Sequence, residues 1–375
     1  MSPRRVLIVT NDFPPRQGGI QSFVYELASR LPAHDVAVYC SAHPGSAEFD
    51  AQLDFPVWRH PTGLLIPTPG ARRRVLAAAA EFGTTAVWFG AAAPLALLTP
   101  ALRAAGVRRA VATTHGHEVG WAKLPLARQA LRRIGNSVDV VTYLGEYTRR
   151  RLAGAFGPQA QLVQLTPGVD SKLFHPDADG RAVRSRYGLA GRPVIVCVSR
   201  LVPRKGQDTL IKALPVIREQ VPGAALLLVG KGPYEKELRA LARQHGVAED
   251  VVFAGGVDHA ELPAHFAAGD VFAMPCRTRR FGMDVEGLGI VFLEASATGL
   301  PVVAGDSGGA PDAVLAGRTG SVVDGTDVRA VAGELVTLLQ DRQLETRLGQ
   351  AGREWVENNW QWDSIADRLA GLLQL

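Results

Sequence analysis

Short apolar segments recur along the chain, with amphipathic segments between them. Each is rich in valine and carries apolar residues at consecutive positions. Strands that are apolar on both faces are typical of a parallel sheet covered by helices. The pattern therefore predicts an α/β architecture with strands at 5–10, 36–40, 86–90, 109–114, 138–144, 193–199, 225–230, 251–256, 270–275 and 301–306.

The segments between these strands have the apolar spacing of helices. One starts at Ile20 and repeats apolar residues through Leu31. Another opens with Pro233 in its first turn and stops at Gly246, in line with the usual preference for proline at helix starts and glycine at helix ends. Residues 355–375 are predicted to form one last helix, whose tryptophans need a large apolar surface.

The strand–helix alternation happens twice, which predicts two domains. A chain of 375 residues is about twice the length of a typical domain. Between the two sets lies a segment rich in Pro, Gly and Asp, residues 166–192, which is interpreted as a linker. Two doubly wound domains are expected to form a cleft between the carboxyl ends of their sheets.

Composition narrows the class of protein. Hydrophobic residues make up 47% and charged residues 21%, as in ordinary globular proteins. No apolar run reaches the roughly 18–20 residues that span a bilayer, and the apolar run before Asn11 is shorter than a signal peptide needs. The chain is expected to be cytoplasmic. Three widely spaced cysteines, without metal-ligand spacing, are predicted to be core thiols.

Charge is distributed unevenly. Residues 1–170 hold 18 Lys and Arg against 11 Asp and Glu, whereas residues 171–375 hold 23 against 25. An excess of positive charge in the first half favours an anionic surface as partner, although ordinary scatter of surface charge would give the same pattern.

Two loops carry cations or glycines where strands end. Gly18 and Gly19 precede the first helix, where free N–H groups favour an anion, but the loop lacks the GxGxxG pattern of dinucleotide-binding proteins. In the second half Arg200, Arg204 and Lys205 follow a strand and precede a helix that Asp208 is expected to cap. Three cations within six residues suit a diphosphate, with a solvated basic turn as the alternative.

Two glutamates stand eight residues apart in an otherwise apolar stretch. On a helix, positions i and i+8 differ by roughly 80°, so Glu286 and Glu294 would not share a face. The glycines at 287 and 289 predict a loop, with a helix from Ile290 that places Glu294 one turn inside. Carboxylates only accept hydrogen bonds, so they pair naturally with the vicinal hydroxyls of sugars. The pattern favours a nucleotide-sugar site.

These motifs carry a family resemblance that covers the whole chain. The E-x7-E pair, the R…K-G loop and the early GG-I resemble the retaining GT-B glycosyltransferases of family 4. The stretches at 10–22, 87–98, 114–121, 199–210 and 272–296 are most similar to the actinobacterial phosphatidylinositol monomannoside mannosyltransferases. Ser199 departs from the pattern, because many members have glycine before the arginine.

The resemblance implies a donor, an acceptor and a set of roles. The donor would be GDP-mannose, and the acceptor the inositol ring of a phosphatidylinositol monomannoside, joined by an α-(1→6) linkage with retention of configuration. Arg200 and Lys205 would hold the diphosphate, Glu294 the ribose, Glu286 the mannose and His117 the reacting region. No cofactor, metal or nucleic acid is expected. Further donor contacts are expected from Gly19, Val257, Gly289 and Ile290.

Acceptor and membrane contacts are expected from the first half. Two basic-apolar segments, 63–74 and 121–135, suit shallow docking on an anionic leaflet, with a core helix edged by solvated charge as the alternative. In the second segment the apolar residues expected near one face are Trp121, Leu124, Leu131 and Ile134, and the cations expected around it are Lys123, Arg128, Arg132 and Arg133. The enzyme would then be peripheral on the inner face of the cell membrane. The residues expected to contribute are Asp12, Gln17, Arg72, Arg128 and Arg132.

The expected domains are 1–168 for the acceptor, 169–355 for the nucleotide-sugar, and a helix at 356–375 returning to the first domain. Three other functions compete with the mannosyltransferase. They are a transferase of the same fold with another donor or a soluble acceptor, a non-catalytic lipid-binding protein, and an epimerase. Intact cations and glutamates count against the lipid-binding alternative, which has no use for a sugar-diphosphate site.

Overall fold

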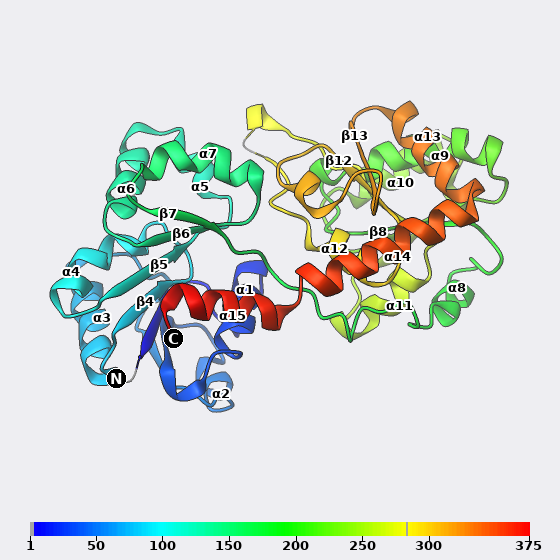
Figure 1. Ribbon diagram of the computed structural model, residues 1–375. Coiled ribbons are helices and arrows are strands. Elements are labelled where there is room, and N and C mark those ends of the chain that lie inside the picture. The colour runs from blue at the N-terminus through cyan, green and yellow to red at the C-terminus, as the bar shows by residue number, and fades with distance from the viewer. Residues whose placement is uncertain (1–3, 283) are drawn as a thin grey trace. The chain divides into compact units, whose positions relative to one another are not determined.

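The computed structural model describes residues 4–282 and 284–375, and the chain divides into two compact units (Figure 1). The first unit comprises Met1–Pro167 with Trp362–Leu375, and the second comprises Gly168–Gln361. Residues 356–361, expected in the C-terminal segment, belong to the second unit, because helix α14 (Arg342–Asn359) continues through 356–359 and the carbonyl of Trp360 accepts from the N–H of Val169. The predicted single last helix is wrong: α14 ends at Asn359, and α15 (Trp362–Leu373) starts anew.

Within the described part of the first unit, seven parallel strands form one sheet in the order β3-β2-β1-β4-β5-β6-β7. The five strands predicted from apolar runs are confirmed. The sequence missed the two edge strands, β3 and β7, because each mixes two apolar residues with two polar ones and none of its residues is fully buried. The strands are β1 Val6–Thr10, β2 Val36–Ser41, β3 Val57–His60, β4 Ala86–Phe89, β5 Arg109–Thr113, β6 Val140–Tyr143 and β7 Gln161–Gln164.

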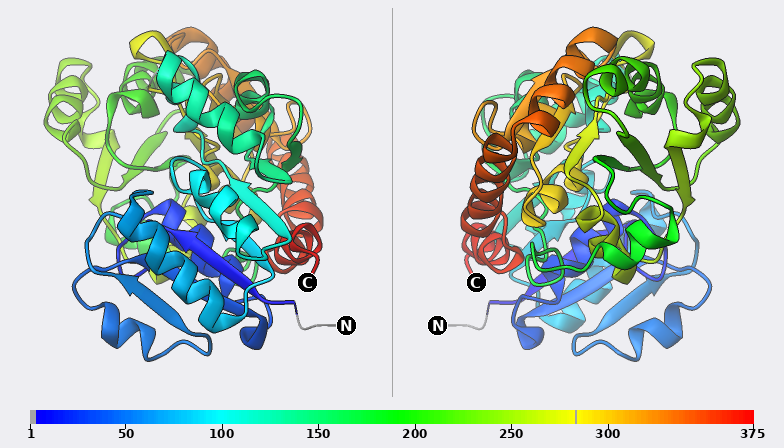
Figure 2. Two further views of the ribbon diagram at one scale, coloured as in Figure 1. Left: turned by 90° about the vertical axis from the view of Figure 1, so that its left-hand side faces the viewer. Right: turned by 90° about the vertical axis from the view of Figure 1, so that its right-hand side faces the viewer.

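Alternate side chains of this sheet feed two separate cores. Val6 and Ile8 face the core made with α1 and α15, whereas Leu7 and Val9 face the core made with α3, α4, α6 and α7. The C-terminal helix thus completes one face of the first unit's sheet, next to α1 (Figures 1 and 2). The helices of this unit are α1 Gly19–Ala28, α2 Ser46–Asp50, α3 Pro69–Phe82, α4 Thr99–Ala104, α5 Glu118–Ala122, α6 Pro125–Gly135 and α7 Glu146–Phe156, with α15.

The second unit has its own parallel sheet, of six strands in the part of the chain described, ordered β10-β9-β8-β11-β12-β13. Its core is continuous, and α9 packs on α10 and α13 while α12 packs on α14 (Figure 1). The strands are β8 Val194–Val198, β9 Ala225–Val229, β10 Val251–Gly255, β11 Val271–Met274, β12 Val302–Gly305 and β13 Gly320–Val323. The remaining helices are α8 Arg181–Arg186, α9 Gln207–Gln220, α10 Glu235–Gln244, α11 Leu262–Ala267, α12 Ile290–Ala297 and α13 Val328–Gln340.

The segment interpreted as a linker is mostly part of the second unit. Phe174, Val183 and Leu189 are buried in its core, and the N–H of Val169 donates to the carbonyl of Trp360 at 2.7 Å. Its Pro, Gly and Asp residues make turns around these anchors, which is why composition alone suggested a linker. All three cysteines are buried, as predicted. Across the described residues, no helix has both the length and the apolar character that crossing a bilayer requires.

Candidate functional site

The residues predicted to bind the donor lie after the carboxyl ends of strands of the second unit's sheet. In α/β proteins this edge is the usual place for a ligand. They follow β8, β10 and β11, and Ile290 and Glu294 lie in α12. In the first unit Asp12, Gln17 and His117 follow β1 and β5, whereas Arg72, Arg128 and Arg132 lie in α3 and α6.

The second unit brings Lys205 and Glu286 together. The ammonium of Lys205 lies 2.6 Å from Oε2 of Glu286, and the two residues are 8% and 6% exposed. Arg204 adds a second cation, 3.9 Å from Glu286 and 3.5 Å from Asp284. Arg279 lies 3.9 Å from Asp284, so three cations surround two carboxylates and the cluster keeps an excess positive charge, which favours an anionic ligand.

Contacts with the segment around Pro275 and Arg277 hold the loop that carries these cations. Gly206 has a φ of +78°, and a Cβ there would collide with the carbonyl oxygen of Pro275. The predicted helix cap is wrong, because α9 starts from Gly206 and Asp208 is instead buried in its first turn. Asp208 accepts a 2.7 Å hydrogen bond from Arg277, whose own N–H donates to the carbonyl of Arg204 at 2.8 Å. These contacts stabilise the conformation of the loop that carries Arg204 and Lys205.

Arg200 differs from its neighbours because its side chain is exposed. Within the described part of the chain it makes no ion pair, so its guanidinium is available to a ligand. Its backbone is fixed all the same. The amide of Gln207 donates to the Arg200 carbonyl at 3.1 Å and to the Ser199 hydroxyl at 2.8 Å, so the serine that departs from the family pattern has a structural partner.

Glu294 lies where the sequence predicted, one turn inside α12. The helix begins at Ile290 after Gly289, which has a φ of +82°. Burial raises the pKa of Glu294 to about 7, and no neighbouring cation contributes to that shift. A carboxyl with these surroundings gains from a ligand that donates hydrogen bonds to it. Val257, after β10, is half-buried against the core of its unit.

The sequence did not predict two features of this cluster in the second unit. Gly308 and Gly309, after β12, lie so close to the Glu286 loop that a Cβ on either would collide with a carbonyl of that loop. Lys231, after β9, is an exposed cation between two glycines. The strand-end positions of "SGG" and "GKG" were the available signals, since both follow predicted strands directly.

The first unit holds a smaller polar cluster around Asp12. Gln21, in α1, donates to Oδ1 of Asp12 at 2.8 Å and is itself buried. Burial raises the pKa of Asp12, although Arg16, His117 and His43 act in the opposite direction. The predicted Gln17 is exposed and Gly19 opens α1, while Gln21, a polar residue within the helix's apolar stripe, was not predicted.

Two histidines follow β5 with different environments. Nε2 of His115 lies 2.6 Å from the carbonyl oxygen of Gly90, and burial lowers the pKa of this histidine to about 4. The His117 side chain is 44% exposed, and its Nε2 lies 3.2 Å from Oε1 of Glu118, which is fully buried. Of the two rings, only His117 is open to a ligand and held by a carboxylate.

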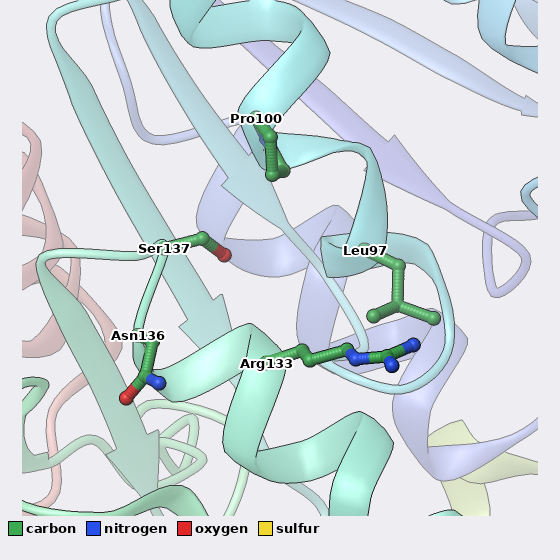
Figure 3. Close-up of a pocket in the computed structure, with 5 residues that line it drawn as sticks. All are labelled: Leu97, Pro100, Arg133, Asn136 and Ser137. Carbon is green, nitrogen blue, oxygen red and sulfur yellow. The ribbon is translucent and has the colours of Figure 1, made fainter.

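The basic residues predicted to form one docking face do not share a surface. Arg128 lines a cavity of about 300 Å³ with Lys123, Arg150 and Arg151. Arg133 lies close to the end of α6, where it lines a different hollow of about 550 Å³ and extends toward Leu97 (Figure 3). Positions 128 and 133 are about 140° apart around a helix, which explains the separation.

The apolar residues of that predicted segment are also divided. Leu131 and Ile134 belong to the core, so the prediction that they share a membrane face with Leu124 is wrong. Leu124 and Leu126 are 61% and 83% exposed. In the other segment Leu64 and Ile66 are exposed, and Arg72 lies on the exposed side of α3. The exposed apolar side chains therefore come from the loop after β3 and from the start of α6.

The described residues contain no group of three or more His, Cys, Asp or Glu arranged to hold a metal ion. The charge of the second unit's half-site comes from lysine and arginine side chains.

Two family models match the chain, one for each unit. The model described as "Glycosyltransferase Family 4" matches residues 17–173, and the model described as "Glycosyl transferases group 1" matches residues 182–355. Together they cover the predicted site residues of both units except Asp12, which precedes the first match.

Curated relatives match over nearly the full length. The chain is 57% identical over 373 residues to the GDP-mannose-dependent alpha-(1-6)-phosphatidylinositol monomannoside mannosyltransferase of Mycolicibacterium smegmatis, covering 98% of each chain. It is 46% identical to the GDP-mannose-dependent monoacylated alpha-(1-6)-phosphatidylinositol monomannoside mannosyltransferase of Corynebacterium glutamicum, covering 99% of this chain and 98% of that one. Among solved structures, HepE of Anabaena in complex with UDP superposes with a TM-score of 0.82 at 22% identity, covering 99% of both chains, which is a likeness of fold.

Proposed function

This chain belongs to the glycosyltransferase family of those mannosyltransferases, and from that premise we propose that it transfers mannose from GDP-mannose to the inositol ring of a phosphatidylinositol monomannoside. The linkage formed is α-(1→6), and the anomeric configuration is retained. The observation that carries the proposal is the 57% identity over 98% of both chains.

The donor half-site of the second unit supports this assignment by its chemistry. GDP leaves as an anion, so its departure is favoured by cations that are already in place. Lys205, Arg204 and the free Arg200 supply that charge, and Glu294 offers a carboxyl to the ribose hydroxyls. In this proposal Glu286 accepts hydrogen bonds from mannose hydroxyls while Lys205 holds it in place.

The transfer breaks the bond between the anomeric carbon and the GDP oxygen and forms one from the same carbon to the acceptor hydroxyl oxygen. Both events occur on one face of the sugar, which retains the configuration. The acceptor proton passes to the departing phosphate oxygen, so no other base is required. His117 is the proposed contact near O6 of the mannose, and Asp12 and Gln17 are proposed acceptor contacts.

The first unit is proposed to dock on the inner face of the cell membrane. Exposed Leu64, Ile66, Leu124 and Leu126 supply shallow apolar insertion. Cations lie near both loops, with Arg72 on α3 and the four residues Lys123, Arg128, Arg150 and Arg151 around their cavity. Each cation near an anionic leaflet contributes roughly 1 kcal/mol, so reversible binding follows without a membrane span.

The test is an incubation with GDP-mannose and a purified phosphatidylinositol monomannoside, with Arg243→Ala, an exposed change on α10, as matched control. We expect a dimannosylated lipid from the parent and from the control. A product only with another donor or a soluble acceptor would indicate a different transferase. Free mannose-nucleotide isomers would indicate an epimerase, and binding without turnover a non-catalytic lipid-binding protein.

Donor choice has its own measurement. Calorimetry is expected to give tighter binding of GDP-mannose than of UDP-glucose, with or without acceptor. Equal or reversed affinities would remove the donor assignment while leaving the family unchanged.

A further inference from the structure

Glu118 is a fully buried carboxyl in α5, the short helix after β5. Removing a carboxylate from water costs several kcal/mol unless partners compensate. One oxygen, Oε2, accepts from the backbone N–H of His115 at 3.1 Å. The other, Oε1, lies 3.2 Å from Nε2 of His117 as an ion-pair contact, and it has no hydrogen-bond partner among the described residues. Burial raises the pKa of Glu118, and His117 acts in the opposite direction.

A purely structural role explains only half of these contacts. A carboxyl that merely closes its own loop needs the bond from His115, and an amide or hydroxyl would serve equally well there. The contact of Oε1 with His117 is different, because it joins a buried charge to a side chain open to a ligand. Because Oε1 gains no hydrogen bond from this contact, the stability of the loop does not account for its position.

We propose that Glu118 is a positioning residue for His117. A carboxylate accepts but does not donate, so the ring nitrogen beside it, Nε2, carries the proton. This electrostatic preference leaves Nδ1 as the nitrogen presented to a ligand and favours the ring orientation that keeps Nε2 beside Oε1. Which ligand His117 meets rests on the proposed function, but the tautomer and the orientation do not.

The neighbouring histidine gives an internal contrast. His115 has its Nε2 on the Gly90 carbonyl, stays neutral because burial lowers its pKa to about 4, and has no carboxylate at its ring. The other charged or titratable groups of this unit that act here are Asp12, which interacts with His117, and Arg16 and His43, which act on Asp12. Their presence requires that Asp12→Asn accompany any pH measurement as a control.

The first test reads the ring directly. Nitrogen-15 NMR of His117, assigned by its loss in His117→Ala, is expected to show the Nε2–H tautomer for neutral wild-type protein. In Glu118→Gln we expect mixed tautomers. An Nδ1–H tautomer in the wild type overturns the proposal, and that result needs no folded variant. An unchanged tautomer in folded Glu118→Gln would overturn it too.

The second test is a double-mutant cycle on transfer activity. Glu118→Gln is expected to lower kcat about tenfold or more with little change in the KM for GDP-mannose. In a His117→Ala background the same change should cost less than about twofold, because the residue acts through His117. Equal losses in both backgrounds would mean a general structural role and overturn the proposal. Glu81→Gln, at an exposed position of α3, is the matched control.

The two tests separate this inference from the proposed function. If no mannosyl transfer is found, the proposed function fails, but the tautomer measurement still decides the role of Glu118. If transfer is found and the cycle is additive, the function stands and the positioning role falls.

Discussion

Each unit buries one glutamate beside a nitrogen-bearing side chain at the carboxyl edge of its sheet, yet the two pairs differ in kind. Glu286 lies against Lys205, and Glu118 lies against His117. A lysine keeps its charge through the neutral range, whereas an imidazole ordinarily changes charge between about pH 5 and 8. The first pair is suited to supply constant charge, and the second to aim a group whose protonation matters.

The surroundings reinforce the difference. Lys205, Arg204 and Arg279 surround Glu286 and Asp284, so cations outnumber carboxylates there. Near Glu118 the ring of His115 is kept neutral, and Asp12 accepts a hydrogen bond from the neutral amide of Gln21. A cluster with an excess of fixed cations fits an anionic leaving group, while one of carboxyl and neutral polar groups fits hydroxyls.

The largest effect is expected from removing a cation of the second unit. Arg200→Ala and Lys205→Ala should each lower turnover by two or more orders of magnitude, about 3 kcal/mol of transition-state stabilisation. Steady-state kinetics with GDP-mannose and lipid acceptor measure it, with Arg243→Ala as control. Near-normal turnover of either variant would contradict the diphosphate role.

Lys205→Ala has a second consequence that Arg200→Ala lacks. It leaves the buried Glu286 without its closest ion-pair partner, so the protein should also lose roughly 3 kcal/mol of folding stability. Adding Glu286→Gln should recover thermal stability without recovering activity. If the double variant regains turnover, the charge of Lys205 serves only to neutralise Glu286.

The affinity for GDP is expected to change about tenfold with pH because of Glu294. Burial raises the pKa of this carboxyl to about 7. Ribose hydroxyls donate to the ionised carboxylate, so GDP affinity should rise up to about tenfold from pH 6 to pH 8. Binding below pH 7 should release a proton, which calorimetry in buffers of different ionisation enthalpy detects. Glu294→Gln should be weaker and flat with pH, and a pH-independent parent would refute the ribose contact.

The same carboxyl predicts the direction of a stability change. Its pKa is raised in the folded state, so the protonated form favours folding. The stability it contributes is present below the unfolded pKa of about 4.5 and is lost as pH rises through about 7. Unliganded Glu294→Gln should therefore show a smaller fall in Tm than the parent between pH 5 and pH 8. A larger fall in the variant would contradict the shifted pKa.

A smaller effect, about fivefold, is expected for membrane docking of the first unit. Arg128→Glu should weaken sedimentation with anionic vesicles by roughly 1 kcal/mol or more, and high salt should weaken the parent similarly. Arg133→Glu is the matched control, because Arg133 lines a different hollow. Equal losses for both would point to diffuse attraction rather than this surface, and GDP-mannose affinity should stay unchanged in each.

No change at all is expected on treatment with EDTA, because arginine and lysine supply the positive charge at the diphosphate. Turnover measured before and after chelation checks this. Loss of activity that magnesium restores would show that side-chain cations are insufficient.

How far sequence alone predicted this molecule depended on whether a feature is local. Apolar runs predicted ten of the strands. As expected, Glu286 and Gly289 lie in a loop before the start of a helix, and Glu294 lies one turn inside that helix. The half-buried edge strands lack that pattern. Contacts between distant loops, such as Lys205 with Glu286 or Gly308 with the Glu286 loop, depend on the order of strands in the sheet, which periodicity does not specify. The prediction of a membrane-docking face at 121–135 was wrong in part, because Leu131 and Ile134 are buried in the core of the first unit.

The most direct test of the central claim is the structure of the product. NMR of the lipid made from GDP-mannose and phosphatidylinositol monomannoside is expected to show one added mannose, in the α configuration, joined by a (1→6) linkage. A β-linked mannose would contradict retention, and another sugar or another position would contradict the donor or acceptor assignment. The absence of any mannosylated lipid, from folded protein that binds GDP-mannose, would contradict the transferase itself.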